Sequence, residues 1–437
     1  MRGAPRRLCI CALAAGAAAA CLAGSNRSAE AATVGVCGKL LPPASGAYLG
    51  AALGDAPRDA RMAAFERLAG QTLSLVSFAQ PWYRGLAFPR SRVLEIWRHG
   101  AVPYLAFLPE SGNVSGPRPR QRNPERRYTL QRIIDGDFDA PLRAWARGAG
   151  DLGVPLLVSF GAAVNDEDQP WNARWNGAGA TEGYGDPDYP DGAERYRDAY
   201  RHLVTLVRSE GVSNVAFVFD AEATPPGPGW NGVALYYPGD TYVDWLGISA
   251  HGAREPAEPL TPFARQLDDS GVYTTLTTVS RRPVAIAELG TAAGAGADRA
   301  GWIRDAFAAL RAGRYARVHA VTWRDAAGGS GDPIDPSADS RASFRAAVSG
   351  QFFAVRPRFS GDCRPPPPVS VTAKAHSKGR VVRVRWSPVL LASAYEVYRD
   401  GRLLGTTKGT TLEDTTAPPG RSHTYTVRAV SPGGRSV

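Results

Sequence analysis

A single carboxylate ends a short apolar run in the sequence Pro283-Val-Ala-Ile-Ala-Glu288-Leu-Gly290-Thr291. The run is too short for a helix and is bounded by proline and glycine, which favours a buried parallel strand. In an α/β barrel, a carboxylate that leaves the C-terminal end of a strand lies where catalytic groups usually lie. Glu288 is therefore a candidate catalytic residue, although a carboxylate here could also cap the next helix or bind an arginine.

Three further acidic residues follow other apolar runs. Asp220 and Glu222 leave the run 214–219, and Glu167 lies in the loop after the run 154–160. Retaining glycoside hydrolysis needs two carboxyl groups about 5–5.5 Å apart, one acting as nucleophile and the other as acid/base. Glu288 is a plausible nucleophile for that chemistry, with these three residues as candidate partners.

Metal-dependent chemistry has little support in the sequence. The six histidines show no H-x-x-x-H spacing, and no C-x-x-C pair is present. Asp186, Asp188 and Asp191 lie in a loop rich in glycine and proline, where turn formation explains aspartates better than calcium binding does. We therefore expect no metal and no cofactor. His251 could orient a carboxylate, donate to a substrate, or be structural.

The chain has 437 residues and a net charge of +10, carried almost wholly by arginine. The arginines are spread through the sequence and are not interleaved with aromatic residues in one run, so we expect no nucleic-acid partner. A hydrophobic content of 44% suffices for a large core. The length allows two or three domains.

The N-terminus has the features of a secretory signal. Arg2, Arg6 and Arg7 precede an Ala-rich apolar stretch at 8–22, and Ala29-Glu-Ala31 is a small-x-small cleavage site. We assign residues 1–31 to a signal peptide and expect a secreted, extracellular protein without stable membrane insertion. Lipid anchoring through Cys21 is the minor alternative.

Two cysteines, Cys37 and Cys363, remain after the signal region. They bracket one predicted domain, and exported proteins meet oxidising conditions, so a disulfide tying the ends of that domain together is expected. Two free thiols, or a lipidated variant, are the alternative.

Eight strand candidates alternate with helix-period segments between these cysteines, which implies parallel βαβ units. We predict a (β/α)₈ barrel over residues 37–363. A doubly wound open sheet is the rival, but no G-x-G-x-x-G or P-loop follows the first strand. The strands are expected at 46–53, 72–78, 102–108, 154–160, 214–219, 244–249, 284–287 and 318–323. The helices are expected at 60–68, 90–98, 140–149, 193–209, 263–269 and 298–312.

The longest predicted loops, at 110–135, 161–191 and 220–242, follow the third, fourth and fifth strands. All three lie on the barrel face of Glu288, and loops of this length in a compact domain usually carry function.

The C-terminal region changes character after a proline linker at 364–368. Residues 369–437 alternate in strand fashion and predict a small all-β sandwich. This region resembles a fibronectin type III module, with Trp386, Tyr395 and Tyr398 in its strands and Tyr425 at the position of the family's corner tyrosine. The sequence stops where a final strand would begin, which would leave a sheet edge open.

Four segments of the barrel region, residues 133–161, 236–248, 283–303 and 321–323, carry a further likeness. They resemble glycoside hydrolase family 26, a group of retaining (β/α)₈ enzymes that act mainly on β-mannans, with some on mixed-linkage β-glucans or β-1,3-xylans. The most specific match is Tyr-Tyr-Pro-Gly-Asp-Thr-Tyr-Val-Asp-Trp at 236–245. The likeness spans about residues 40–355 and implies that Glu288 is the nucleophile.

The sequence departs from the family at the acid/base. The family has Gly-His-Glu-Met-Asn after the fourth strand, with the Glu as acid/base, whereas this chain has Gly161-Ala-Ala-Val-Asn165. The Asn is kept, and the Glu position is Ala163. The family's Trp-Ser-Pro-Asn after the fifth strand is replaced by Phe-Asp-Ala-Glu at 219–222, and His251 follows the sixth strand, where the family usually has a tyrosine.

Three interpretations remain open. A relocated carboxylate among Glu222, Asp220 and Glu167 could serve as acid/base, because a general acid is defined by geometry and pKa. The barrel could instead bind glycans without hydrolysis. In the third, Glu288 acts by different chemistry or with an acid supplied by the substrate.

Aromatic residues at strand ends and in long loops fit sugar binding, because indole faces pack against pyranose rings. Trp245, inside a strand, is expected in the core.

The favoured prediction is a monomeric secreted glycosidase that cleaves a β-linked polysaccharide, β-mannan or related, by a retaining mechanism. The alternative is a glycan-binding protein with a degenerate site. The predicted substrate-binding residues are Asn165, Trp171, Trp175, Trp230, His251, Trp323 and Trp82.

Overall fold

The computed structural model describes residues 37–54, 57–112, 125–254, 256–292, 298–325, 337–376 and 380–437, together with the backbone of residues 8–10. The chain divides into two compact units, residues 38–360 and residues 361–437, the second including the N-terminal residues up to Cys37. Apart from residues 8–10, the predicted signal segment, with Cys21, lies outside the described residues. No described helix is long and apolar enough to cross a membrane.

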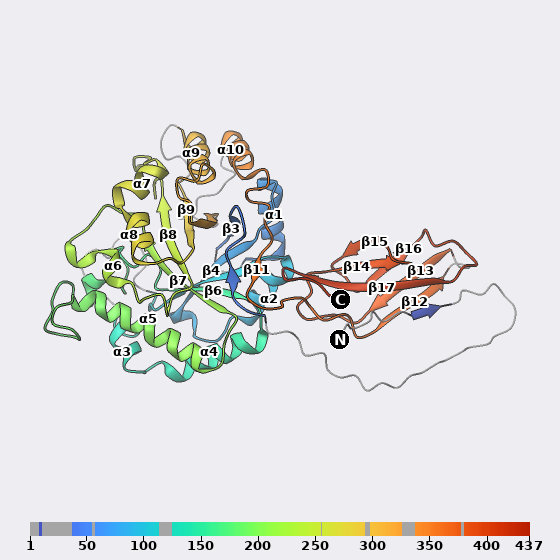
Figure 1. Ribbon diagram of the computed structural model, residues 1–437, viewed down its shortest axis with the longest axis horizontal. Helices are drawn as coiled ribbons and strands as arrows, with labels where there is room; N and C mark the ends of the chain where they lie inside the picture. Colours follow the sequence, from blue (N-terminus) through green and yellow to red (C-terminus); the bar gives the residue numbers. More distant parts are fainter. Residues whose placement is uncertain are drawn as a thin grey trace. The chain divides into compact units, whose positions relative to one another are not determined.

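Eight parallel strands close into a barrel in residues 38–360, which confirms the predicted (β/α)₈ fold. Each strand pairs with its sequence neighbour, and the last strand pairs with the first. Figure 1 shows the strands inside a ring of helices. The strands are β3 (Tyr48–Ala52), β4 (Leu75–Pro81), β5 (Val102–Leu108), β6 (Leu156–Phe160), β7 (Val215–Glu222), β8 (Trp245–His251), β9 (Val284–Gly290) and β10 (Val318–Arg324).

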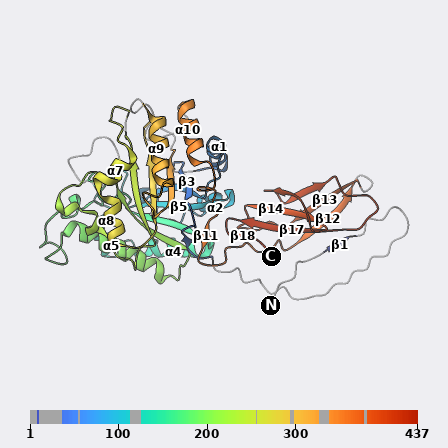
Figure 2. The same cartoon turned by 45° about the horizontal axis from the view of Figure 1, so that its top comes forward.

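The helices cover the outside of the barrel, and α1, α10 and α9 lie side by side in two views (Figures 1 and 2). The six predicted helices are α1 (Asp59–Ala69), α2 (Arg90–His99), α4 (Asp139–Leu152), α5 (Asp191–Ser209), α7 (Phe263–Ser270) and α9 (Arg299–Arg311). The sequence analysis missed α3 (Leu130–Ile134), α6 (Val233–Tyr236), α8 (Val272–Val279) and α10 (Ala338–Val348). Outside the barrel, the two-residue strands β2 (Leu40–Leu41) and β11 (Arg358–Phe359) pair antiparallel.

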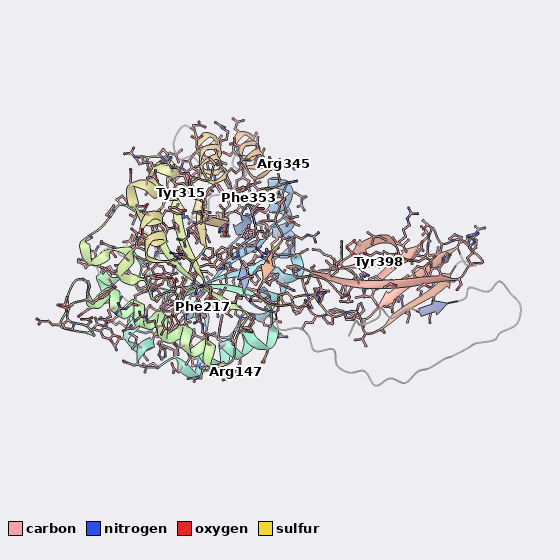
Figure 3. The ribbon with its side chains drawn as sticks, viewed as in Figure 1. Arg147, Phe217, Tyr315, Arg345, Phe353 and Tyr398 are labelled. Atoms are coloured by element: carbon pink, nitrogen blue, oxygen red, sulfur yellow. A yellow bond between two sulfur atoms is a disulfide. The ribbon has the colours of Figure 1, made fainter. Side chains whose placement is uncertain are left out.

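The strands are hydrophobic runs because both of their faces are covered. All eight residues of β7 are buried, and Phe217 on this strand and Phe353 after α10 belong to the core (Figure 3). Trp245 is buried on β8, as expected.

Strand β9 contains a bulge next to Glu288. Ile248 of β8 pairs with Ile286, but the next residue, Ser249, pairs with Glu288, so that β9 holds one extra residue there. The pairing with β10 shifts at the same place. A bulge re-aims the side chain beside it, and bulges are frequent next to active sites. The predicted end of this strand at residue 287 is therefore too early, because β9 continues through Glu288 to Gly290.

The C-terminal unit is an all-β module of two antiparallel sheets. The first contains β12 (Val371–His376), β13 (Val381–Trp386) and β16 (Thr411–Asp414); the second contains β14 (Ala394–Arg399), β15 (Arg402–Thr407) and β17 (His423–Ser431). The hydroxyl of Tyr425 donates to Asp414 Oδ2 at 2.8 Å, and Tyr398 on β14 donates to Glu396 (Figure 3).

The edge of β17 is not open along its whole length, contrary to expectation. Strand β1 (Leu8–Ile10) pairs antiparallel with its start, and β18 (Gly434–Arg435) pairs with its end. Cys37 and Cys363 form a disulfide, as their sequence positions predict.

Candidate active site

A cavity of about 390 Å³ lies at the carboxyl ends of the barrel strands. One wall carries Glu222, His251 and Glu288, the last residues of β7 and β8 and a late residue of β9. Parallel strands end on the same face of a barrel, and side chains two apart on a strand share one side of the sheet. The closure of the barrel therefore brings these three side chains together, although they are far apart in the sequence.

Glu288 faces the cavity with 41% of its side chain exposed. Its Oε2 lies 3.4 Å from His251 Nε2 and 3.9 Å from Arg324 Nε. Burial favours the neutral acid, but the hydrogen bond and charge of His251, with the charge of Arg324, outweigh it and lower the pKa of Glu288. Glu288 is thus a carboxylate at neutral pH, the form that a nucleophile requires.

His251 bridges two carboxylates with the two nitrogens of one ring. Nδ1 lies 3.3 Å from Glu222 Oε1, and Nε2 lies 3.4 Å from Glu288 Oε2. Burial opposes the charged imidazolium, but the charges of both carboxylates raise the pKa of His251 to about 9. The ring is therefore a cation at neutral pH, and it orients both carboxylates.

Glu222 is held ionised by two cations. Its Oε1 also lies 2.9 Å from Arg254 Nη2. Burial alone would raise the pKa of this carboxyl, yet His251 and Arg254 together lower it to about 2. Its backbone is fixed as well, because the Asn165 side chain accepts from the Glu222 N–H at 2.7 Å and donates to the Glu222 carbonyl at 3.0 Å.

Asp220 does not line this cavity. Its residue is 2% exposed, and its carboxyl oxygens lie 3.3 and 3.4 Å from Ser249 Oγ. Burial, with the nearby charges of Glu288 and Glu222, raises the pKa of Asp220 well above its usual range. The raised pKa favours the neutral acid, and the Asp220 side chain does not line the cavity that holds Glu288.

Asp166 and Arg254 complete the site, and the sequence analysis missed both. Arg254 Nη1 lies 3.4 Å from Asp166 Oδ2, and both residues line the cavity. Asp166 adjoins Asn165, the residue that matches the Asn of the family 26 pattern, within a predicted functional loop, and this position could have indicated it. Arg254 lies in the loop after β8, where no pattern in the sequence indicated a role.

The opposite wall of the cavity is made of small apolar residues. Ala162 and Ala163 line it where the family 26 resemblance would place His and Glu, together with Ala79, Ala106 and Leu108 from β4 and β5. Ala163 has a φ of 54°, a left-handed conformation that is rare for residues other than glycine. Neither Ala162 nor Ala163 carries a carboxyl group.

Glu167 is not brought to Glu288. It lines a different and larger cavity and pairs with Arg174 at 2.7 Å. Among the three candidates for the acid/base, only Glu222 lines the same cavity as Glu288.

The predicted sugar-binding tryptophans divide into two groups. The predictions for Trp82 and Trp323 are wrong, because both are fully buried: Trp82 packs on Phe107, and Trp323 on Phe344. Each follows or ends a strand whose residues pack inward, and burial removes the indole face from any ligand. Trp171 is also buried, but it lines the cavity and donates from Nε1 to the Ala162 carbonyl at 2.9 Å.

Trp175 and Trp230 are half-buried and line neither cavity described in this site. Asn165 lines the larger cavity, but its amide is engaged by the Glu222 backbone. Asn165 therefore positions Glu222.

Asp186 and Asp191, which a calcium site would need, accept hydrogen bonds from backbone N–H groups of their own loop at Asp188 and Gly183.

Comparison with known proteins gives sequence relatives among polysaccharide-degrading enzymes. The chain is 24% identical to Endoglucanase H of Acetivibrio thermocellus over 307 residues, which are 70% of this chain and 30% of that protein. It is 25% identical to the beta-1,3-xylanase TXYA of a Vibrio species over 122 residues, 28% of this chain and 22% of the relative. The chain thus spans less than a third of the length of the curated relatives it matches. No protein-family model matches it.

Solved structures with the same fold include family 26 mannanases. The catalytic domain of the Bacillus sp. JAMB-750 GH26 endo-β-1,4-mannanase has a TM-score of 0.51 at 15% identity, covering 71% of this chain and 87% of that chain. A modular endo-β-1,4-mannanase from Cellulomonas fimi has a TM-score of 0.50 at 16% identity, covering 89% and 92%. At these identities the likeness establishes a glycoside hydrolase-like fold and no more.

Proposed function

We propose that the protein acts on a β-linked polysaccharide, β-mannan or related, as a retaining glycoside hydrolase with Glu288 as nucleophile and Glu222 as acid/base. One observation carries the proposal: both carboxylates line one cavity at the C-terminal end of the barrel, on the two nitrogens of His251. The names of the relatives, an endoglucanase, a β-1,3-xylanase and endo-β-1,4-mannanases, support the substrate class.

In this mechanism, Glu288 attacks the anomeric carbon and forms a glycosyl ester while a proton passes to the leaving oxygen. A water molecule then cleaves the ester as the same acid/base removes its proton. Glu288 is already ionised for the first step. Glu222 must be protonated for that step, so the Arg254 side chain has to leave its carboxylate when substrate binds.

A second function, glycan binding without hydrolysis, is favoured by two features of the same cavity. The position of the family's acid/base is Ala163, and two cations hold Glu222 ionised. If Arg254 stays in place, the cavity offers a substrate no carboxylic acid from Glu222.

The N-terminal charge and apolar pattern supports a further proposal, that the protein is exported, with lipid anchoring at Cys21 as the alternative. The strand pattern of residues 369–437 supports a fibronectin type III-like module that acts as a spacer. We also propose that the protein is a monomer.

Hydrolysis of dinitrophenyl β-mannoside and β-glucoside tests the nucleophile, because such leaving groups need little acid assistance. Glu288→Ala should lower kcat/KM by about 10²-fold or more. Glu210→Ala should leave it unchanged, since Glu210 pairs with Arg143 and Arg147 of helix α4 and lines neither cavity. Equal activity in Glu288→Ala and the natural protein would refute the assigned nucleophile.

The acid/base assignment has its own test in the same assay. Glu222→Ala should hydrolyse activated substrates with slow deglycosylation, and azide, which needs no general base, should accelerate its turnover. Azide should not accelerate the natural protein. If the natural protein is inactive on activated substrates while it still binds mannohexaose or cellohexaose, glycan binding is the function.

A further inference from the structure

A second cavity of about 780 Å³ adjoins the site at the carboxyl end of the barrel. Its walls come from the loops after β6 and β7 and from the α7–α8 region. Asp166 and Glu222 line both this cavity and the smaller one that holds Glu288. The two cavities therefore meet at these two side chains.

Arg254 joins the two residues that the cavities share. Its Nη2 lies 2.9 Å from Glu222 and its Nη1 lies 3.4 Å from Asp166. The Arg254 side chain is 45% exposed, so a ligand can reach the bridge that it makes. Hydroxyl groups of a bound chain can replace the guanidinium as partners of both carboxylates, because carboxylate oxygens accept from hydroxyls.

The wall of the larger cavity is preorganised. Asn231 donates from Nδ2 to the Asn165 carbonyl at 3.0 Å, and its Oδ1 accepts from Asn172 at 3.0 Å. Asn165 in turn is bonded to the backbone of Glu222. The loops after β6 and β7 are thus tied to each other and to the end of β7 before any ligand binds, which lowers the entropic cost of binding.

The chemistry of the larger cavity suits a neutral, hydroxyl-rich ligand. Asp168 and Thr275 offer acceptors, Arg174 offers donors, and the apolar faces of Pro225 and Pro228 are available to the C–H faces of a pyranose ring. Four carboxylates and one guanidinium line it, so phosphates and other anions are repelled. Its volume is within the range of ligand-binding pockets.

We propose that the larger cavity is a second saccharide-binding site, which holds the part of the polysaccharide that extends past Glu222, and that the Asp166–Arg254–Glu222 bridge separates it from the reactive cavity in the free protein. The inference rests on the proposed function, because it assigns the two cavities to one polysaccharide chain. A long oligosaccharide occupies both cavities, and a short one occupies only the smaller.

Calorimetric binding of mannohexaose and cellohexaose, compared with the corresponding disaccharides, tests this site. Thr275→Trp fills the larger cavity from α8, and it should weaken hexasaccharide binding by about tenfold or more while disaccharide affinity changes less than about twofold. The matched control is Thr274→Trp, since Thr274 is the exposed neighbour on the same helix and does not line the cavity. The control should bind both ligands as the natural protein does.

A second substitution, Ala234→Trp, fills the cavity from an exposed position on α6 and serves if Thr275→Trp unfolds. Hexasaccharide affinity that is unchanged in both variants would overturn the second site and leave the proposed function intact. A natural protein that binds neither hexasaccharide nor disaccharide would refute the proposed function and this inference together.

Discussion

The charges of the site balance at the level of single residues. Three carboxylates face three cations, and burial with its carboxylate neighbours raises the pKa of Asp220, which favours the neutral form of that acid. Such balance allows several ionisable groups to be buried together. The carboxylates are Asp166, Glu222 and Glu288, and the cations are His251, Arg254 and Arg324.

Arg254→Gln should raise activity on unactivated substrates. Removing the guanidinium leaves Glu222 buried with His251 as its remaining cation, so the pKa of Glu222 rises from about 2. At a pH above that pKa, each unit of increase raises the protonated fraction about tenfold. We expect kcat/KM for mannohexaose near neutral pH to rise in proportion, and kcat/KM for dinitrophenyl glycosides to stay within about twofold.

The pH dependence of stability checks the cause. Glu222 has a lowered pKa in the folded protein, so its ion pairs stabilise the fold fully above the ordinary glutamate pKa of 4.5, and this stability is lost as the pH falls toward about 2. Arg254→Gln should therefore lower Tm at neutral pH and lose less stability on acidification. The charged and ionisable groups around Glu222 are Asp166, Asp220, His251, Arg254 and Glu288. A variant with an unchanged pH profile would contradict this account.

At the level of elements, the sequence predicted where the strands lie better than how they end. Short apolar runs predicted all eight barrel strands, and alternation places Asp220 and Glu222 on one face of β7. The bulge beside Glu288 was not predictable, because a hydrophobic run carries no information on register. Arg254 was missed because its position depends on the conformation of a loop.

The Asn165 side chain ties the loop after β6 to the end of β7, and its removal should destabilise the protein. Asn165→Ala leaves the backbone N–H and carbonyl of Glu222 without these partners in a buried place, which costs about 1–3 kcal/mol for an unpaired group. Urea unfolding followed by tryptophan fluorescence measures the loss. Asn176→Ala is the matched control, since its amide bonds only Pro170 and Asn172 within the same loop. An equal or larger loss in the control would contradict the special role of Asn165.

At the scale of the whole molecule, the alternation of strands and helices predicted the barrel and the likeness to family 26 agreed with it, whereas the departure from the family's acid/base pattern left the chemistry open. The fold is stabilised by many weak hydrophobic contacts, so it tolerates an alanine at position 163 where the family pattern has a glutamate. A catalytic site depends on the placement of a few groups. In the proposed mechanism these include Glu222, His251 and Arg254, which the closed barrel brings to one cavity. Trp82 and Trp323 were predicted to bind sugar, but both are buried in the core. Their positions near strand ends do not show on which side of the strand the ring packs.

The disulfide between Cys37 and Cys363 should be a major source of stability, since it joins residues 326 positions apart and so restricts the unfolded chain strongly. Removing a native disulfide from a secreted domain costs about 2–5 kcal/mol. In a protein truncated to residues 32–437, Cys37→Ala with Cys363→Ala should lower Tm, and dithiothreitol should lower the Tm of the truncated natural protein equally without affecting the double variant. If the reductant lowered the Tm of both proteins alike, or the double variant kept the natural Tm, the stabilisation would not come from this bond. Activity on dinitrophenyl glycosides at 25 °C should persist in the double variant, because neither cysteine lines the cavity.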